Sequence, residues 1–124
     1  MKFHHVCIWT SDYDKSIHFY VDLLGLNLYR ETFSHKHHVK KLELYCEDQY
    51  VIEMFVGGSS LIRTQKMKIG FEHVSFLIEN VREKLDEMKK AGVITDDPKI
   101  DENTGQEYGF CFDPDGNKIE LYSL

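Results

Sequence analysis

Residues 71–78 of the chain read FEHVSFLI, and residues 3–10 read FHHVCIWT. Further along, residues 48–55 read DQYVIEMF and residues 115–122 read DGNKIELY. A gap of only one residue brings both pairs of segments into a common alignment, so the chain is a twofold repeat. Each copy carries one His near its start and one Glu near its end. These residues are His5 and Glu53 in the first copy, and His73 and Glu120 in the second.

The composition is that of an ordinary globular protein of one domain. Of its 124 residues, 42% are hydrophobic and 29% are charged. Each half, at roughly 60 residues, is marginal for a core of its own. The net charge of −6 argues against a nucleic-acid partner. The sequence contains no apolar run long enough to span a membrane and no apolar signal region at its start. Three cysteines without a Cys-x-x-Cys pair suit a reducing cytoplasm.

Hydrophobic alternation and capping residues predict a βαβββ order in the first half. Ser11 and Asp12 can cap a helix that ends near Gly25. Its apolar positions at helical spacing are Ile17, Tyr20, Val21 and Leu24. The predicted strands cover residues 3–10, 26–33, 41–47 and 50–56, with hairpin connections at residues 34–38 and 48–49.

The second half repeats this order after a predicted linker over residues 57–69. Asn80 should cap a helix that Gly92 closes, with buried positions at Val81, Leu85, Met88 and Ala91. The predicted strands cover residues 72–78, 108–112 and 118–122, with a weak strand near 93–95 and an Asp-Pro-Asp-Gly turn at 113–116. We therefore predict an α+β fold in a single domain, residues 1–124, built from tandem βαβββ modules at about 1–56 and 70–124.

The alternation also indicates a shared functional face. The aliphatic residues of the opening and closing strands should pack against the helices, which turns His5, His73, Glu53 and Glu120 to the opposite face. Inward-facing carboxylates require a compensating cation, and two imidazoles with two carboxylates suit a divalent transition metal. A strand His is more often structural and a strand Glu is usually solvated. From the pattern alone, the metal site and the structural interpretation are equal alternatives.

The same residues resemble the vicinal oxygen chelate superfamily, which includes glyoxalase I, fosfomycin-resistance proteins, extradiol dioxygenases and bleomycin-resistance proteins. The resemblance covers essentially the whole chain. Its motifs are the two His strands, SIHFY at residues 16–20 with LGL at 24–26, and FDPDGNKIEL at residues 112–121. It implies that the two modules form a curved mixed-sheet cleft. It also implies the glyoxalase I ligand set at His5, Glu53, His73 and Glu120.

The implied activity is that of a metal-dependent lyase or isomerase similar to lactoylglutathione lyase. In glyoxalase I a thiol adds to methylglyoxal, and a base moves a proton of the resulting hemithioacetal through a metal-stabilised enediolate. We assign the base to Glu120, with Glu53 as the symmetry-related second catalytic carboxylate, although the sequence does not decide which Glu is the base. The metal would be Ni²⁺, Co²⁺, Mn²⁺ or Zn²⁺, among which the ligand set does not choose.

The substrate side departs from bacterial glyoxalase I. Trp9 stands where that family has an Arg, and Gly57 where it has an Asn, and both family residues contact glutathione. Trp9 would instead form an apolar wall that a flat ligand could stack on, although a structural role explains it at least as well. Cys7 lies on the same face two residues from His5 and could contact the substrate, although a small buried thiol is the default interpretation. Arg63, Lys66 and Lys68 could steer an anionic substrate, although a solvated linker is the better explanation of these residues. The substrate is thus a small molecule, possibly a thiol adduct, of open identity.

Two alternatives remain open at this stage. One is a metal-dependent thiol transferase or dioxygenase of the same superfamily, which would use two His and one Glu and leave Glu53 unexplained. The other is a metal-free protein that binds a small molecule, as resistance proteins do. In either case we expect a homodimer whose modules pair within one chain or across two. His4, and Glu72 at the matching position, should point away from the site and are excluded from it.

Overall fold

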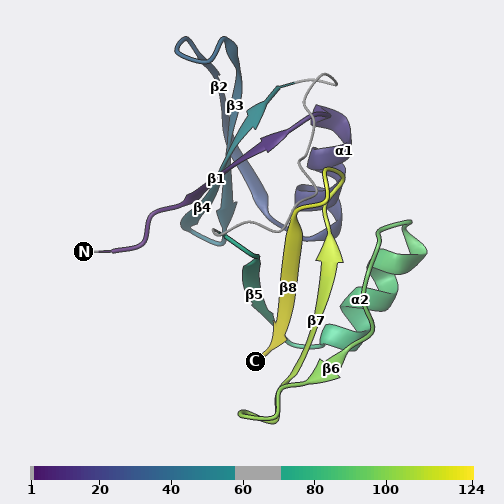
Figure 1. The fold of residues 1–124 in the computed structure, drawn as a ribbon. Helices are drawn as coiled ribbons and strands as arrows, with labels where there is room; N and C mark the ends of the chain where they lie inside the picture. Colours follow the sequence, from purple (N-terminus) through teal and green to yellow (C-terminus); the bar gives the residue numbers. More distant parts are fainter. Residues whose placement is uncertain (1, 58–70) are drawn as a thin grey trace. The chain divides into compact units, whose positions relative to one another are not determined.

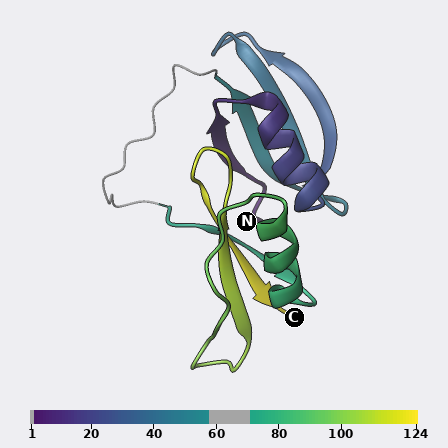
Figure 2. The same ribbon diagram turned by 90° about the vertical axis from the view of Figure 1, so that its right-hand side faces the viewer.

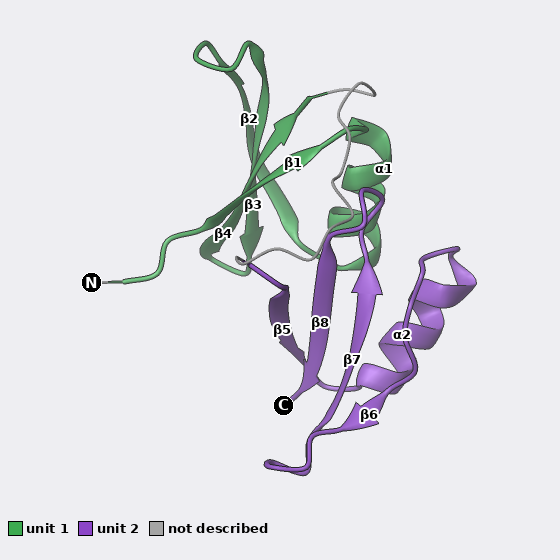
Figure 3. Cartoon of the chain, viewed as in Figure 1, with its two compact units in different colours: residues 1–63 green, residues 64–124 purple. Residues whose placement is uncertain are grey.

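The computed structural model describes residues 2–57 and 71–124 of the chain (Figure 1). The chain divides into two compact units, Met1–Arg63 and Thr64–Leu124 (Figure 3). Apart from Gly57, the predicted linker with Arg63, Lys66 and Lys68 lies outside the described residues. In each unit the helical segment lies against one face of a four-stranded sheet (Figure 2). Among the described residues, no helix is long and apolar enough to cross a membrane.

The first unit has the predicted βαβββ order. Its elements are β1 (Val6–Thr10), α1 (Tyr13–Ile17), η1 (His18–Leu23), β2 (Asn27–Ser34), β3 (Val39–Cys46) and β4 (Gln49–Val56). The strands lie in the order β1-β4-β3-β2. β1 runs parallel to β4, and the other neighbours are antiparallel. The parallel pair places the opening strand beside the closing strand, which brings the two ends of the module together.

The helical segment of this unit differs from the predicted regular helix. Asp12 caps it as expected, accepting a hydrogen bond from the backbone N–H of Lys15 at 3.0 Å. After α1 the segment continues as the π-helical turn η1, which widens the turn and rotates the following side chains. As a result Phe19 is buried beside Tyr20, whereas Ile17 and Val21 are only half-buried. The turn geometry is the part of this helix that the apolar spacing did not predict.

The second unit repeats the arrangement. Its elements are β5 (Val74–Ile78), α2 (Val81–Lys90), β6 (Lys99–Ile100), β7 (Glu107–Phe112) and β8 (Lys118–Ser123). The strands lie in the order β5-β8-β7-β6, with β5 parallel to β8. Helix α2 packs closely on β7 at Gly109. A Cβ atom at this position would lie only 2.4 Å from Cδ1 of Leu85. Glycine thus permits the close approach of helix and strand at this point.

Two predictions for this unit are wrong. Residues 93–95 form no strand: Thr95 makes only an isolated bridge to Cys111, and the second strand is the short β6 further along. Ala91 is exposed at the end of α2, because Gly92 in a left-handed conformation (φ 89°) already ends the helix there. The Asp-Pro-Asp-Gly turn is confirmed. There the Asp113 carboxylate accepts hydrogen bonds from the backbone N–H groups of Asp115 and Asn117.

The core confirms the alternation on which the functional interpretation depends. In the first unit Leu42, Leu44, Ile52 and Met54 are at most 1% exposed, and in the second Cys111, Ile119 and Leu121 are at most 2% exposed. Ile52 and Met54 flank Glu53 on β4, and Ile119 and Leu121 flank Glu120 on β8, so both glutamates lie on the opposite sheet face. We call this face, in each unit, the site face. The α+β class and the two βαβββ modules are thereby confirmed.

Candidate functional site

The first unit brings His5 and Glu53 together on its site face. His5 lies directly before β1, and Glu53 lies in the middle of β4, the parallel neighbour of β1. Nε2 of His5 is 3.6 Å from Oε2 of Glu53, and the two side chains are 28% and 19% exposed. The sequence prediction that these residues share a face is therefore correct for this half.

The second unit contains the same pair. His73 lies directly before β5 and Glu120 in the middle of β8. Nε2 of His73 is 3.5 Å from Oε2 of Glu120, and the side chains are 31% and 15% exposed. The sequence repeat is thus a repeat of geometry: each unit presents one imidazole nitrogen to one carboxylate oxygen at nearly the same distance.

The residue before each His contacts the other nitrogen of the ring. Nδ1 of His4 lies 2.7 Å from Nδ1 of His5, and Glu72 accepts a hydrogen bond at Nδ1 of His73. Lys118 in turn donates to Oε1 of Glu72 at 2.7 Å. The Lys118 hydrogen bond, followed by that of His73, lowers the pKa of the Glu72 carboxyl. The prediction excluded His4 and Glu72 because strand alternation alone turns them away. Both contact the ring nitrogen that faces away from the carboxylate, so they touch the candidate ligands from outside the His and Glu pairs.

Cys7 lies beside Glu53 in the parallel pairing of β1 and β4. Its side chain is exposed, yet the loss of water around the sulfur raises the pKa of the thiol from 9.0 to about 11. The hydrogen bond to Glu53 acts in the same direction. Cys7 is therefore a neutral thiol near pH 7 and a hydrogen-bond donor to Glu53, in keeping with a contact residue and not with a nucleophile.

Further charged groups surround Glu53. Nζ of Lys41 lies 3.4 Å from Oε1 of Glu53. Glu43, paired with Glu53 across β3 and β4, is only 7% exposed and accepts two hydrogen bonds from Arg30, at 3.0 and 3.1 Å. Neither Arg30 nor Glu43 was identified from the sequence. The alternation of β3 places Glu43 on the site face, but its partner depends on a register shift in β2 that the sequence does not reveal.

Trp9 belongs to a cluster of three rings at one end of the same face. It is 42% exposed and lies 5.1 Å from Phe55 and 5.6 Å from His37 between ring centroids. The His37 and Phe55 rings are 4.8 Å apart. The structure therefore places Trp9 on the predicted face, as part of an aromatic group that includes the hairpin residue His37.

Tyr50 stacks on His5, with 4.6 Å between the centroids. Burial, followed by the charge of Glu53, raises the pKa of its hydroxyl. In the part of the chain that the structure describes, this hydroxyl is buried without a hydrogen-bond partner. Tyr50 therefore fixes the plane of the His5 ring through its own ring face and not through a polar contact.

The chemistry of the two pairs fits a divalent metal. Two donor atoms about 2.1 Å from one ion and at tetrahedral angles lie about 3.4 Å apart, close to the 3.6 and 3.5 Å observed. Each unit supplies two of the four predicted ligands. Within residues 2–57 and 71–124 the structure contains no group of three or more His, Cys, Asp or Glu side chains spaced for a metal. A complete four-residue site would therefore need both pairs.

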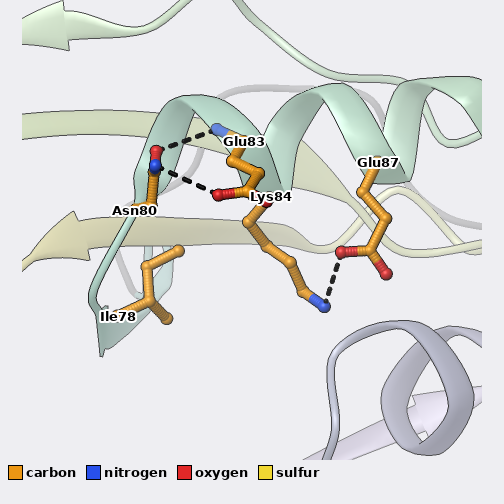
Figure 4. A pocket seen from close by; sticks show the side chains of 5 residues that line it. All are labelled: Ile78, Asn80, Glu83, Lys84 and Glu87. Carbon is orange, nitrogen blue, oxygen red and sulfur yellow. Dashed lines mark hydrogen bonds and ion pairs between the residues drawn. The ribbon is translucent and has the colours of Figure 1, made fainter.

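An open pocket lies elsewhere, at the N-terminal end of α2 (Figure 4). Its lining residues are Ile78, Asn80, Glu83, Lys84 and Glu87. Asn80 accepts from the backbone N–H of Glu83 at 3.0 Å and donates to its carboxylate at 3.1 Å, and Lys84 pairs with Glu87 at 3.2 Å. The polar side chains of this pocket are thus engaged in capping and pairing within the helix, and neither His73 nor Glu120 lines it.

Comparisons with known proteins show the family of the chain. The model of the Glyoxalase/Bleomycin resistance protein/Dioxygenase superfamily matches residues 2–121. The uncharacterized protein YwkD of Bacillus subtilis (strain 168) is 35% identical over 120 residues, which cover 96% of this chain and 94% of that protein.

Two solved structures are similar over nearly the whole chain. A glyoxalase family protein from Enterococcus faecalis is 31% identical, with a TM-score of 0.84 over 98% of this chain and 96% of that chain. The trypanothione-dependent glyoxalase I of Leishmania major is 27% identical, with a TM-score of 0.80 over 99% of this chain and 86% of that chain. The family resemblance inferred from the sequence and the predicted fold class are confirmed.

Proposed function

This chain belongs to the glyoxalase, bleomycin-resistance protein and dioxygenase superfamily and has its vicinal oxygen chelate fold, and we propose that it is a metal-dependent lyase or isomerase of the glyoxalase I type. The observation that supports this proposal is the repeated pair of an imidazole nitrogen and a carboxylate oxygen, 3.6 Å apart in one unit and 3.5 Å in the other. We propose that His5, Glu53, His73 and Glu120 hold one divalent metal. The two pairs come from one chain or from two chains of a homodimer. We place the protein in the cytoplasm.

A bound divalent metal would supply Lewis acidity at the substrate oxygens, with Ni²⁺, Co²⁺, Mn²⁺ and Zn²⁺ as candidates. In the proposed reaction Glu120 removes the proton from the carbon next to the carbonyl and returns it to the neighbouring carbon. We assign this step to Glu120 because Glu53 also forms an ion pair with Lys41 at 3.4 Å, which holds one of its oxygens in place. Glu53 is then the second carboxylate of the site.

The substrate we propose is a small α-hydroxycarbonyl compound or the hemithioacetal formed by a thiol and an α-ketoaldehyde. Cys7 would contact it beside Glu53, and Trp9 would flank it as an aromatic wall together with Phe55. Rings of this kind favour an apolar or flat group on the substrate over an anionic one. The glutathione-binding Arg and Asn expected from the family are replaced by Trp9 and Gly57, so the thiol is the part of the substrate to determine.

The metal content and the reaction can be tested together. Purified protein is analysed for bound metal, stripped with a chelator, and reloaded with Ni²⁺, Co²⁺, Mn²⁺ or Zn²⁺. Each form is then assayed with methylglyoxal and a panel of thiols that includes glutathione and small monothiols. We expect isomerisation of at least one hemithioacetal by at least one metal form. The proposal would be contradicted if no thiol of the panel gave metal-dependent activity with any of the metal forms.

A second candidate, metal-free binding of a small aromatic molecule, draws support from the exposed cluster of Trp9, Phe55 and His37. Metal titration of the wild-type chain separates it from the enzyme, because a binding protein of this kind requires no ion. A third, the thiol transferase or dioxygenase, is separated by Glu53→Gln. A site of two His and one Glu would keep its wild-type metal affinity and activity in that variant, whereas a four-ligand site would bind its metal more weakly and lose part of its activity.

A further inference from the structure

His5 and His73 are each preceded by a residue that contacts Nδ1, the ring nitrogen that faces away from the carboxylate. In the second unit this residue is Glu72, whose Oε2 accepts from Nδ1 of His73, while Nε2 of His73 faces Glu120 at 3.5 Å. In the first unit it is His4, whose Nδ1 lies 2.7 Å from Nδ1 of His5. The two halves thus orient their imidazoles at the same position with chemically different groups.

A carboxylate and an imidazole place different demands on their neighbour. A neutral imidazole has one donor and one acceptor nitrogen, and an ionised carboxylate only accepts. The contact with Glu72 therefore places the proton of His73 on Nδ1, which leaves the Nε2 lone pair directed at the carboxylate of Glu120. Two acceptors that face each other at this distance repel unless a cation lies between them.

The partner of His5 makes no such demand. The ring of His4 can donate at Nδ1 or accept there, so either nitrogen of His5 can carry its proton. If the proton is on Nε2, it points at Glu53, and the His5 ring donates to the carboxylate instead of accepting a metal. The His5 ring can therefore form a hydrogen bond to Glu53 without an ion. The His73 ring, when it is neutral and protonated at Nδ1, cannot form one to Glu120.

Glu72 is itself held in place. Lys118 donates to its other oxygen, Oε1, at 2.7 Å. The ammonium group of Lys118 also lies 4.1 Å from the centroid of Phe110, and that ring lies 5.4 Å from the ring of His73. His73, Glu72, Lys118 and Phe110 thus contact one another in a closed ring of four side chains. These contacts restrict the motion of the Glu72 carboxylate and of the His73 imidazole that it orients.

We propose that Glu72, fixed by Lys118, is a positioning residue that holds His73 as the Nδ1–H tautomer, so that the His73–Glu120 half binds the divalent metal more tightly than the His5–Glu53 half. This inference rests on the proposed metal-dependent function. Outer partners of this kind typically change metal affinity by about 10–100-fold when they are replaced. Glu72 would thus act on the metal through His73, without touching the ion or the substrate.

The first test is metal affinity of the full chain, measured by calorimetric titration of the stripped protein with Zn²⁺ and with Ni²⁺. We expect Glu72→Gln to weaken binding by about 10–100-fold, Lys118→Met to weaken it less, and His4→Phe to weaken it least. Glu102→Gln, which removes the same charge from an exposed loop of the same unit, is the matched control and should bind as wild type does. Equal affinities for Glu72→Gln and Glu102→Gln would overturn the inference.

The second test needs no metal. Nitrogen-15 NMR of the stripped protein at about pH 8, above the usual imidazole pKa of about 6.5, reports which nitrogen of His73 carries the proton. We expect Nδ1–H in the wild type and a mixture of tautomers in Glu72→Gln. A proton on Nε2, or on both nitrogens, in the wild type would overturn the positioning role. Failure of the wild type to bind any divalent metal would instead overturn the proposed function, while the tautomer result still decides the role of Glu72.

Discussion

The two halves of the molecule share their candidate ligands and differ in almost everything around them. Strand pairing places Lys41, Glu43 and Leu42 of β3 in the positions that β7 fills with Tyr108, Phe110 and Gly109. The first unit therefore surrounds its glutamate with charges, whereas the second surrounds it with aromatic rings. The repeat retains what a metal and a core require. The differences between the copies are where the roles of ligand, base and substrate contact can diverge.

The largest expected effect separates the two glutamates. At saturating metal, Glu120→Gln should lower kcat by about 10²–10⁴-fold because an amide cannot accept the transferred proton. The assay uses methylglyoxal with the thiol that gives the highest wild-type rate. Glu53→Gln, compared at its own saturating metal concentration, should retain more activity. If Glu53→Gln lost more than Glu120→Gln, the base would belong to the first half instead.

The next effect concerns Cys7, which stands beside Glu53 as Ser75 stands beside Glu120. Because the folded protein raises the thiol pKa from 9.0 to about 11, the thiolate fraction near pH 8 should be about 100-fold lower than that of an unperturbed thiol. Alkylation by iodoacetamide, followed by mass spectrometry, should thus be slow and should accelerate as the pH rises towards 11.

Glu53→Gln provides the control for this measurement. It removes a hydrogen bond and a negative charge that both favour the neutral thiol, so alkylation of Cys7 should become faster at a given pH. An alkylation rate equal to that of a short cysteine peptide would show that the site face around Glu53 leaves the thiol unperturbed.

A smaller effect tests the close contact of helix and sheet that is particular to the second unit. Gly109→Ala should destabilise the protein by about 1–3 kcal/mol, because its Cβ would meet Leu85 at 2.4 Å. Urea unfolding of Gly109→Ala, Leu85→Ala and the double variant measures the coupling. The glycine substitution should cost less once Leu85 is shortened. Equal costs in both backgrounds would exclude Leu85 as the cause.

The smallest effect compares the two helix caps. Asp12 and Asn80 each accept a hydrogen bond from a backbone N–H three residues along, in both cases at 3.0 Å. Replacement of either by Ala should cost about 1 kcal/mol in the free energy of unfolding, as measured by thermal or urea unfolding. Asp12→Gly and Asn80→Gly should cost less and serve as controls. A cost confined to one cap would show that the two helical segments contribute unequally despite the repeat.

Period-two alternation was sufficient to predict the faces of both closing strands, because Glu53 and Glu120 lie between buried aliphatic residues. Asp12, Asn80 and the turn at 113–116 were predicted from local chemistry and confirmed. The contacts of His4 and Glu72 with Nδ1 of the neighbouring His were not predicted, because alternation holds only inside a strand and each residue lies two positions before one.

Other features depend on tertiary contacts that leave no local signal. The π-helical turn at His18–Leu23 changes which side chains are buried without a change in apolar spacing. The short β6 pairs two exposed residues, Lys99 and Ile100, with β7, so burial could not reveal it. The Arg30–Glu43 pair results from a register shift in β2. In each case the partner lies on another element, and the sequence pattern gives only one side of the contact.

A crystal structure of the protein loaded with Zn²⁺ or Ni²⁺ tests the central claim most directly. The account predicts one ion bound by Nε2 of His5, Nε2 of His73 and one carboxylate oxygen each of Glu53 and Glu120, at about 2.0–2.2 Å. It also predicts that Glu72 retains its hydrogen bond to Nδ1 of His73. An ion bound elsewhere, or these four side chains around no ion at saturating metal, would contradict the account.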